Sequence, residues 1–243
     1  MNQPIDRRTL VKLGGFGTAG AVAASVLPIA TAAAQTAPAP ATAPKPATYR
    51  VKPLPFDSKT IKGLSEKILT SHYENNYTGA VKRLNAITEQ LAGLDFTKTP
   101  VFVVNGLKRE ELIAANSMIL HELYFAGIGD ESQPGSALAE AITRDFDSVG
   151  RWQAEFIAMG KAEGGGSGWV LLTWNSRDKR LLNTWAADHT MTLAGGQPIL
   201  ALDMYEHAYH MDYGAKAGDY VDAYMKAIRW ANADQLFERY GRA

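Results

Sequence analysis

The stretch PILALDMYEHAYH, residues 198–210, joins a short apolar run to an acid and then to two histidines. Its first residues predict a short buried strand, and a helix is expected to begin at Met204. Asp203 would then lie at the mouth of that helix and His207 one turn along it, so both side chains can point the same way. This pair would be half of a transition-metal site, although a helix-capping acid followed by a buried core histidine gives the same pattern.

The stretch also resembles the signature of iron/manganese superoxide dismutases, D-x-[WY]-E-H-A-Y, here DMYEHAY over residues 203–209. The resemblance covers about residues 49–243. It implies that the protein converts superoxide to dioxygen and hydrogen peroxide at one Fe or Mn ion per subunit. The choice between Fe and Mn stays open, because mixed imidazole and carboxylate donors suit both metals. The resemblance assigns these donors to four residues: His72, His121, Asp203 and His207.

The composition limits which metal ligands and which binding partners the chain can have. The 243 residues include no cysteine, 46% are hydrophobic, and the formal net charge is zero. Without cysteine the chain has neither disulfides nor thiolate metal ligands, so any metal must use histidine and carboxylate. Without a basic excess it is not expected to bind nucleic acid.

The first 34 residues are predicted to be a signal peptide rather than part of the fold. DRRTLVK at 6–12 is a twin-arginine pattern, an apolar Gly/Ala-rich segment follows at 13–29, and AAA at 32–34 offers a cleavage site. This predicts export to the periplasm by the twin-arginine machinery, with an uncleaved membrane anchor as the alternative. Residues 35–48, rich in Ala and Pro, are expected to be an extended linker.

The rest of the chain predicts an α+β fold. We expect an N-terminal antiparallel helical hairpin domain over 49–132, then an α/β metal-binding domain over 133–243 with a three-stranded antiparallel sheet. The apolar run at 101–104 lies in a loop-like context. Periodicity predicts helices at 64–91, 108–127, 136–146, 148–161, 204–209, 220–230 and 234–240, and strands at 169–174, 180–185 and 199–202.

Three further residues are candidates for catalysis. The resemblance places His189 near the metal-bound solvent, although a surface histidine is the plain alternative. Trp169, which follows Gly-Ser-Gly, corresponds to the tryptophan that forms a wall of the metal pocket. Tyr73, the residue after His72, is the third candidate catalytic residue.

Two more residues are expected to act through a second subunit. The resemblance implies a homodimer or tetramer in which Glu206 crosses a two-fold interface and hydrogen-bonds a ligand histidine of the partner. A solvated helix acid is the alternative for this glutamate. His210 stands where the family has a tyrosine, and it is assigned to the same interface.

Several positions depart from the family pattern, mainly around the substrate entrance. Ala80 replaces the usual gateway tyrosine and Asn76 a histidine, while Ser117, Tyr205 and Arg229 also differ from the usual residues. These changes leave open a slow or non-catalytic metal-binding relative. A mononuclear metal hydrolase is a further alternative, but the sequence offers no evident general base for it.

Overall fold

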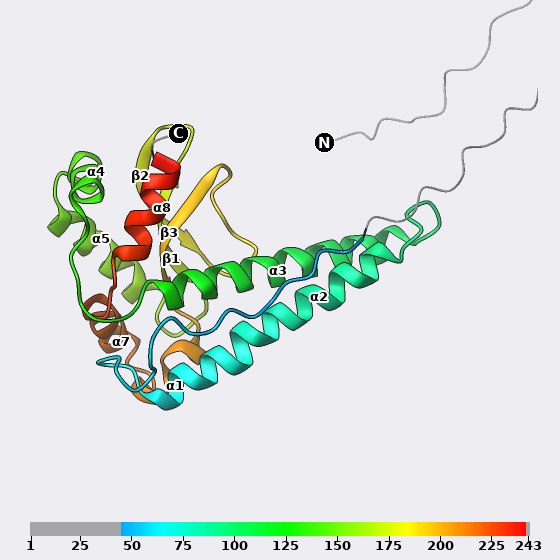
Figure 1. The fold of residues 1–243 in the computed structure, drawn as a ribbon, viewed down its shortest axis with the longest axis horizontal. Coiled ribbons are helices and arrows are strands. Elements are labelled where there is room, and N and C mark those ends of the chain that lie inside the picture. The colour runs from blue at the N-terminus through cyan, green and yellow to red at the C-terminus, as the bar shows by residue number, and fades with distance from the viewer. Residues whose placement is uncertain (1–44, 242–243) are drawn as a thin grey trace, which may run out of the picture. The chain divides into compact units, whose positions relative to one another are not determined.

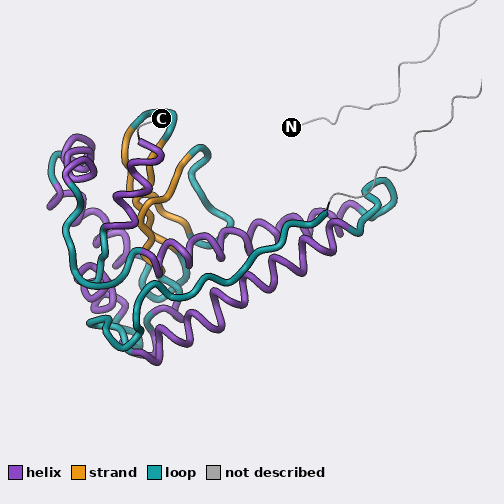
Figure 2. Tube along the Cα trace, in the orientation of Figure 1, coloured by secondary structure: helices purple, strands orange, loops and turns teal. Residues whose placement is uncertain are grey.

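The computed structural model describes residues 45–241, in which helices surround a single three-stranded sheet (Figure 1). The predicted signal segment and most of the predicted linker lie outside the described residues. Strands are confined to one part of the fold, and most of the remainder is helical (Figure 2). This confirms the predicted mixed class with a three-stranded antiparallel sheet.

The sheet is built from β1 (Trp169–Asn175), β2 (Arg180–Ala186) and β3 (Gly196–Asp203), in the order β2-β1-β3. Both pairings are antiparallel, and β1 is buried along its whole length because α5 and α8 pack against it. The register pairs Trp169 with Asp203. The expected pocket-wall tryptophan and the expected metal carboxylate therefore lie at the same end of the sheet.

β3 begins earlier than predicted, so Pro198 lies inside the strand and does not mark its start. The pairing of β1 with β3 shifts register between Leu172 and Thr173, where Thr173 pairs with Pro198. Proline has no N–H to give to a ladder and is tolerated at such irregularities.

The predicted helix at 64–91 is three consecutive segments: α1 (Glu66–Ser71), the π-helix η1 (His72–Tyr77) and α2 (Thr78–Ala92). The side chain of Ser65 caps the start by accepting from the Ile68 N–H at 3.1 Å. Because η1 begins at His72, the π-helical turn includes this residue. Such turns are common at functional sites.

α3 (Val101–Ala126) lies beside α2, and residues 93–100 connect the two helices (Figure 1). The prediction that this helix begins near Lys108, after a loop-like apolar run, was wrong. Pro100 takes the N-cap position, and Val101 and Phe102 form the first helical turn with exposed side chains. Among residues 45–241 they belong to no strand, and their side chains are not part of the core.

The helices that cover the sheet are mostly as predicted. α4 (Ser136–Phe146) has the predicted bounds, and α5 (Val149–Ala162) begins after Ser148, whose side chain caps it. α7 (Ala217–Lys226) and α8 (Ala231–Gly241) replace the predicted 220–230 and 234–240. α7 ends early because the chain after it pairs with residues 127–129, with an isolated bridge from Ile128 to Ile228.

The predicted helix at 204–209 is wrong in detail. Tyr205 is extended, a short 3-10 turn η2 (Glu206–Ala208) follows, and α6 (His210–Tyr213) comes next. The Asp203 side chain causes this break, because its Oδ1 accepts from the Tyr205 N–H at 2.9 Å. An Asp that bonds the backbone two residues on offers a turn in place of a helix.

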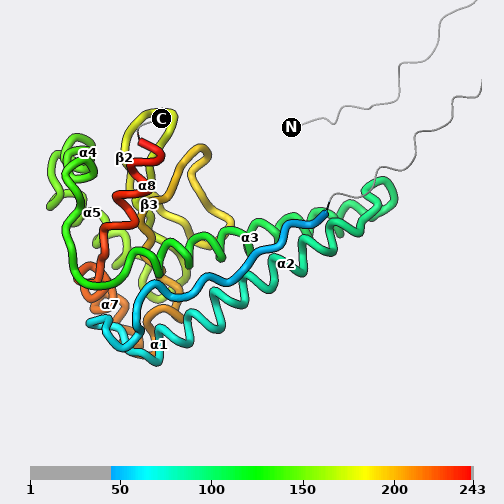
Figure 3. The backbone as a smooth tube through the Cα atoms, in the orientation of Figure 1, coloured from blue at the N-terminus to red at the C-terminus, as the bar shows by residue number. Residues whose placement is uncertain are grey.

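Before α1, an extended arm runs along the helical pair (Figure 3). Asn85 holds it, since its Oδ1 accepts from the Tyr49 N–H at 2.7 Å and its Nδ2 donates to the Tyr49 carbonyl at 2.9 Å. In addition, the Lys52 N–H donates to the Tyr77 hydroxyl at 2.8 Å. Within residues 45–241, no helix is both long and apolar enough to cross a membrane.

Candidate metal centre

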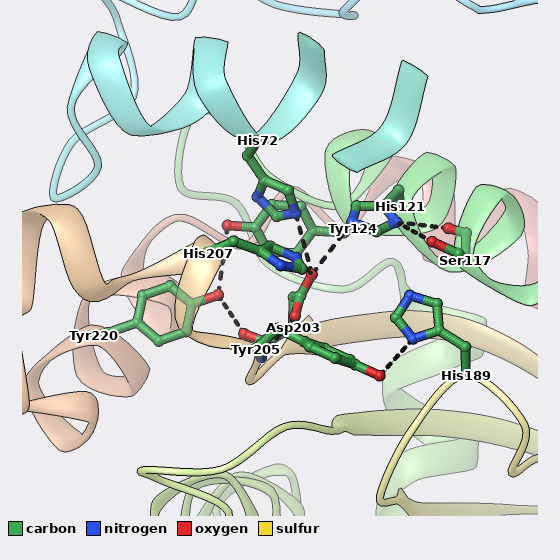
Figure 4. A network of polar contacts seen from close by, with 9 residues as sticks. All are labelled: His72, Ser117, His121, Tyr124, His189, Asp203, Tyr205, His207 and Tyr220. Carbon is green, nitrogen blue, oxygen red and sulfur yellow. Dashed lines mark hydrogen bonds and ion pairs between the residues drawn. The ribbon is translucent and has the colours of Figure 1, made fainter. Parts of the chain in front are cut away.

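Four side chains from four separate elements converge in the interior (Figure 4). One ligand atom from each lies within 4.8 Å of the others. The four residues are His72 on η1, His121 on α3, Asp203 at the end of β3 and His207 on η2. These are the four residues that the resemblance assigned as donors.

The geometry centres on one carboxylate oxygen. Oδ2 of Asp203 lies 3.1 Å from Nε2 of His72 and 3.3 Å from Nε2 of His207. Nε2 of His121 is 3.6 Å from the same oxygen. Three imidazole nitrogens therefore face a single carboxylate oxygen.

His121 gives the clearest test of whether a metal fits here. Its Nδ1–H donates to the Ser117 carbonyl at 2.6 Å, one turn back on α3. A neutral imidazole that is protonated on Nδ1 carries a lone pair on Nε2. That Nε2 is buried and has no hydrogen-bond partner among the described residues. A cation between the four donors would satisfy it, so the residues fit a bound metal.

Burial and nearby charges favour neutral His121 and His72 side chains and an ionised Asp203. Burial lowers the pKa of His121 to about 3, and it also lowers the pKa of His72 although Asp203 accepts a hydrogen bond from that ring. Burial acts to raise the pKa of the Asp203 carboxyl, but contacts with His207 and His72 outweigh it and hold that pKa below its ordinary value. Neutral imidazoles and an ionised carboxylate are the forms that bind metal.

The carboxylate is held on several sides. Its Oδ1 accepts from the Tyr205 N–H, and the backbone carbonyl of Asp203 accepts from the Tyr220 hydroxyl at 2.8 Å. Tyr220 is fully buried and lies 3.5 Å, hydroxyl to hydroxyl, from Tyr124. These contacts fix the ligand through its backbone and its second oxygen, leaving Oδ2 free to face the histidines.

His189 and Trp169 both lie beside this group. The Trp169 ring meets His121 edge-on at a centroid separation of 5.3 Å, as expected of a pocket wall. The His189 ring is buried, 5.9 Å from His121 and 5.7 Å from Trp169. Asn116 on α3 holds its loop by donating to the His189 carbonyl at 2.6 Å.

The other predicted residues lie further out. The Tyr73 hydroxyl donates to the Lys52 carbonyl at 2.9 Å, which places this side chain in the packing of the arm and away from the metal ligands. Glu206 and His210 are exposed and line a surface depression beside His207. The His207 side chain is itself 26% exposed, unlike the other three ligands.

Sequence reasoning missed the most specific contact around the site. Tyr205 was noted only as a departure from the family, yet its hydroxyl lies 2.7 Å from Nδ1 of His189. The Tyr220 bond to Asp203 was missed as well. Both contacts join different elements, over 16 and 17 residues of chain, and a single sequence carries no signal for them. Of the departures at the entrance, Ala80 is a buried residue of α2.

Comparison with known proteins agrees with this geometry. Residues 134–236 match the family described as iron/manganese superoxide dismutases, C-terminal domain. The superoxide dismutase [Fe] of Cupriavidus metallidurans is 66% identical over 189 residues, which is 78% of this chain and 96% of that protein. Superoxide dismutase [Mn] 2 of Haloferax volcanii is 35% identical over 81% of this chain and 97% of that protein. The superoxide dismutase [Fe] of Aquifex pyrophilus is 32% identical over 76% and 89%. The chain therefore belongs to the iron/manganese superoxide dismutase family.

Proposed function

We propose that this protein is a superoxide dismutase that uses one Fe or Mn ion per subunit. The observation that carries the proposal is the convergence of three imidazole nitrogens on Oδ2 of Asp203, with the Nε2 lone pair of His121 otherwise unsatisfied. Iron is the first metal to test, because the 66%-identical relative is named a superoxide dismutase [Fe]. The Haloferax relative, named for manganese, keeps the second metal open.

The chain's own residues would position and insulate the reaction. An iron or manganese ion held here would supply reversible one-electron transfer, so that one superoxide loses an electron to become dioxygen and a second gains an electron and two protons from solvent to become hydrogen peroxide. The Ser117 carbonyl fixes the orientation of His121, and Trp169 excludes water from one side of the site. We assign the catalytic contact beyond the ligands to His189. Tyr73 is a weaker candidate, because its hydroxyl is bonded to the arm.

The test is superoxide removal per bound metal atom, with Fe and Mn measured separately. Asp203→Asn preserves shape but removes the anionic donor, so metal content and turnover should both fall at least tenfold. Asp222→Asn is the matched control, because Asp222 forms a surface ion pair with Lys161. Bound iron or manganese without turnover in the wild type would contradict the enzyme and favour a non-catalytic relative. Zinc with hydrolytic activity would favour the hydrolase.

We also propose a homodimer formed through the face that carries His207, with a tetramer as the larger alternative. A partly exposed ligand supports this, because it lies in a depression with Glu206 and His210 that a partner subunit would cover. Glu206 would then hydrogen-bond His207 of the partner subunit. Light scattering should give twice the subunit mass, and Glu206→Ala should weaken both the dimer and metal retention. A monomer at micromolar concentration would contradict the proposal.

The proposed organisation assigns two ligands to each part of the chain. The helical part, 49–132, contributes His72 and His121, and the α/β part, 133–243, contributes Asp203 and His207. Ahead of them, residues 1–34 would be a twin-arginine signal and 35–48 a linker, so that the folded protein is exported to the periplasm. Replacing both Arg7 and Arg8 with Lys should retain the protein in the cytoplasm. Unchanged periplasmic yield would contradict this route.

A further inference from the structure

Tyr205 and His189 lie beside the metal ligands and contact each other directly. The Tyr205 hydroxyl lies 2.7 Å from Nδ1 of His189 (Figure 4). The Ser167 side chain and the His189 backbone also hydrogen-bond this hydroxyl. The two rings meet edge-on at 4.7 Å. The same Tyr205 ring stacks on the ligand His207 at 5.2 Å, with an interplanar angle of 13°. The ring of Tyr205 thus stacks on the ligand His207, and its hydroxyl contacts His189.

Both partners are held independently of this bond. The Tyr205 N–H donates to Oδ1 of Asp203, which fixes the tyrosine backbone next to the ligand. The loop of His189 is tied to α3 through Asn116, and Asp188 caps the local turn by accepting from the Thr190 N–H at 2.6 Å. These contacts fix the backbone of His189 but not the rotation of its ring. The Tyr205 hydroxyl is the contact that can select one ring orientation.

We infer that Tyr205 is a positioning residue that sets the ring orientation and tautomer of His189. The hydroxyl donates to Nδ1, so the single proton of the neutral imidazole lies on Nε2. His189 then presents an N–H, and not a lone pair, at its other nitrogen. The inference rests on the proposed function, because it assigns a task to His189 beside a bound redox metal. Hydrogen bonds around the ligands of a metal tune its potential and activity.

The chemistry of the side chain makes the assignment specific. A tryptophan, the other residue that the signature allows at this position, offers a ring for stacking on His207 but has no hydroxyl. Phenylalanine likewise keeps the stacking and loses only the hydroxyl with its hydrogen bonds. Tyr205→Phe is therefore a one-atom test that separates positioning from packing.

The experiment is a double-mutant cycle on the metal-loaded protein with Tyr205→Phe, His189→Ala and the double variant. Two quantities are measured: turnover per bound metal and the midpoint potential of the metal. We expect Tyr205→Phe to lower turnover about tenfold and to shift the potential in the same direction as His189→Ala. The double variant should match His189→Ala alone, because Tyr205 acts through that histidine.

Tyr213→Phe is the matched control, because its hydroxyl donates to the Gly63 carbonyl away from His189. It should leave both quantities unchanged, and metal content together with thermal midpoint verifies that each variant folds. A Tyr205→Phe protein with wild-type turnover and potential would overturn the inference, as would additive effects in the double variant. A wild type that binds metal but removes no superoxide would contradict the proposed function. The potentials, with the His189 ring position in a crystal structure of Tyr205→Phe, would still decide the inference.

Discussion

His121 is held through a backbone atom, which determines how much the site depends on the side chain at position 117. Nδ1 lies 2.6 Å from the Ser117 carbonyl and 3.3 Å from the Ser117 hydroxyl. A protonated Nδ1 that donates to the carbonyl has no lone pair for the hydroxyl. The backbone is therefore the functional partner, and it is present whatever residue occupies the position.

Ser117→Ala should accordingly retain metal and turnover to within about twofold, since only a weak contact is lost. Metal analysis with the superoxide assay checks this expectation. A loss of tenfold or more would mean that the hydroxyl orients His121. Ser117→Gly, which also lacks the hydroxyl, would then be expected to fail in the same way.

Glu163 is a second residue to consider, because its surroundings raise the pKa of its carboxyl group. It is 9% exposed, and neither carboxylate oxygen has a hydrogen-bond partner among the described residues. Burial, with a smaller contribution from the charge of Asp203, raises the pKa of Glu163 to about 7 from an ordinary 4.5. The folded protein therefore holds this proton between about pH 4.5 and 7, where the unfolded chain has released it.

The sign of the effect on stability follows from proton binding. Because the folded state binds more protons in this window, the free energy of unfolding falls as pH rises from about 4.5 to 7. Glu163→Gln removes the ionisation, so it should be more stable than wild type at pH 8 by about 1–3 kcal/mol, with little difference at pH 4.5. Urea unfolding at both pH values measures this. A constant difference would show that ionisation of Glu163 is not responsible.

At the residue scale, motifs predicted the ligands but not the contacts between segments. DMYEHAY contains Asp203 and His207, and the family resemblance assigned His72 and His121. The bond from Tyr205 to His189 depends on how the loop after β2 lies against the start of η2. That arrangement is decided by tertiary packing, for which one sequence gives no direct signal.

At the element scale, the errors fall where local propensity and tertiary contacts disagree. Periodicity gave the α4 bounds correctly and placed three strands, because those segments are strongly patterned. It could not reveal the π-helical turn at His72–Tyr77, since one additional residue in a turn barely alters an apolar stripe. It also missed the first turns of α3, where exposed Val101 and Phe102 follow no amphipathic pattern.

Gly168, directly before β1, has no room for a side chain. Gly168 has φ +152°, and a Cβ there would lie 2.5 Å from Oε2 of Glu163 and 2.6 Å from the Ala186 carbonyl oxygen. Gly168→Ala should therefore destabilise the fold by at least about 2 kcal/mol, because the backbone of β2 cannot move away cheaply. The measurement is the free energy of unfolding in urea.

Gly106→Ala is the matched control for this change. A Cβ at Gly106, inside α3, meets nothing within 4 Å. The change should stabilise the protein by about 0.5–1 kcal/mol, the usual gain from replacing an unconstrained helical glycine. Equal destabilisation by both changes would refute the steric argument at Gly168.

At the scale of the whole molecule, the metal centre connects parts that the chain itself joins only indirectly. The ligands come from η1, α3, β3 and η2, so one bound ion would tie the helical pair to the sheet. Without it, two buried imidazoles and a partly exposed one face a buried carboxylate, and the Nε2 of His121 has no hydrogen-bond partner among the described residues. Binding free energy is then available only to the folded state.

Removal of the metal should therefore lower the thermal midpoint of the whole protein. A free metal concentration of 1,000 times Kd stabilises the fold by about 4 kcal/mol. For a protein of this size each kcal/mol corresponds to roughly 2–4 °C, so chelation should lower the midpoint by roughly 8–16 °C. Calorimetry with and without chelator measures the change, and added Fe or Mn should reverse it. Asp203→Asn should melt near the chelated wild type and be insensitive to chelator. If chelation left the wild-type midpoint unchanged, the four ligands would not be holding these elements together through a metal, and the helical pair would have to be fixed to the sheet by packing alone.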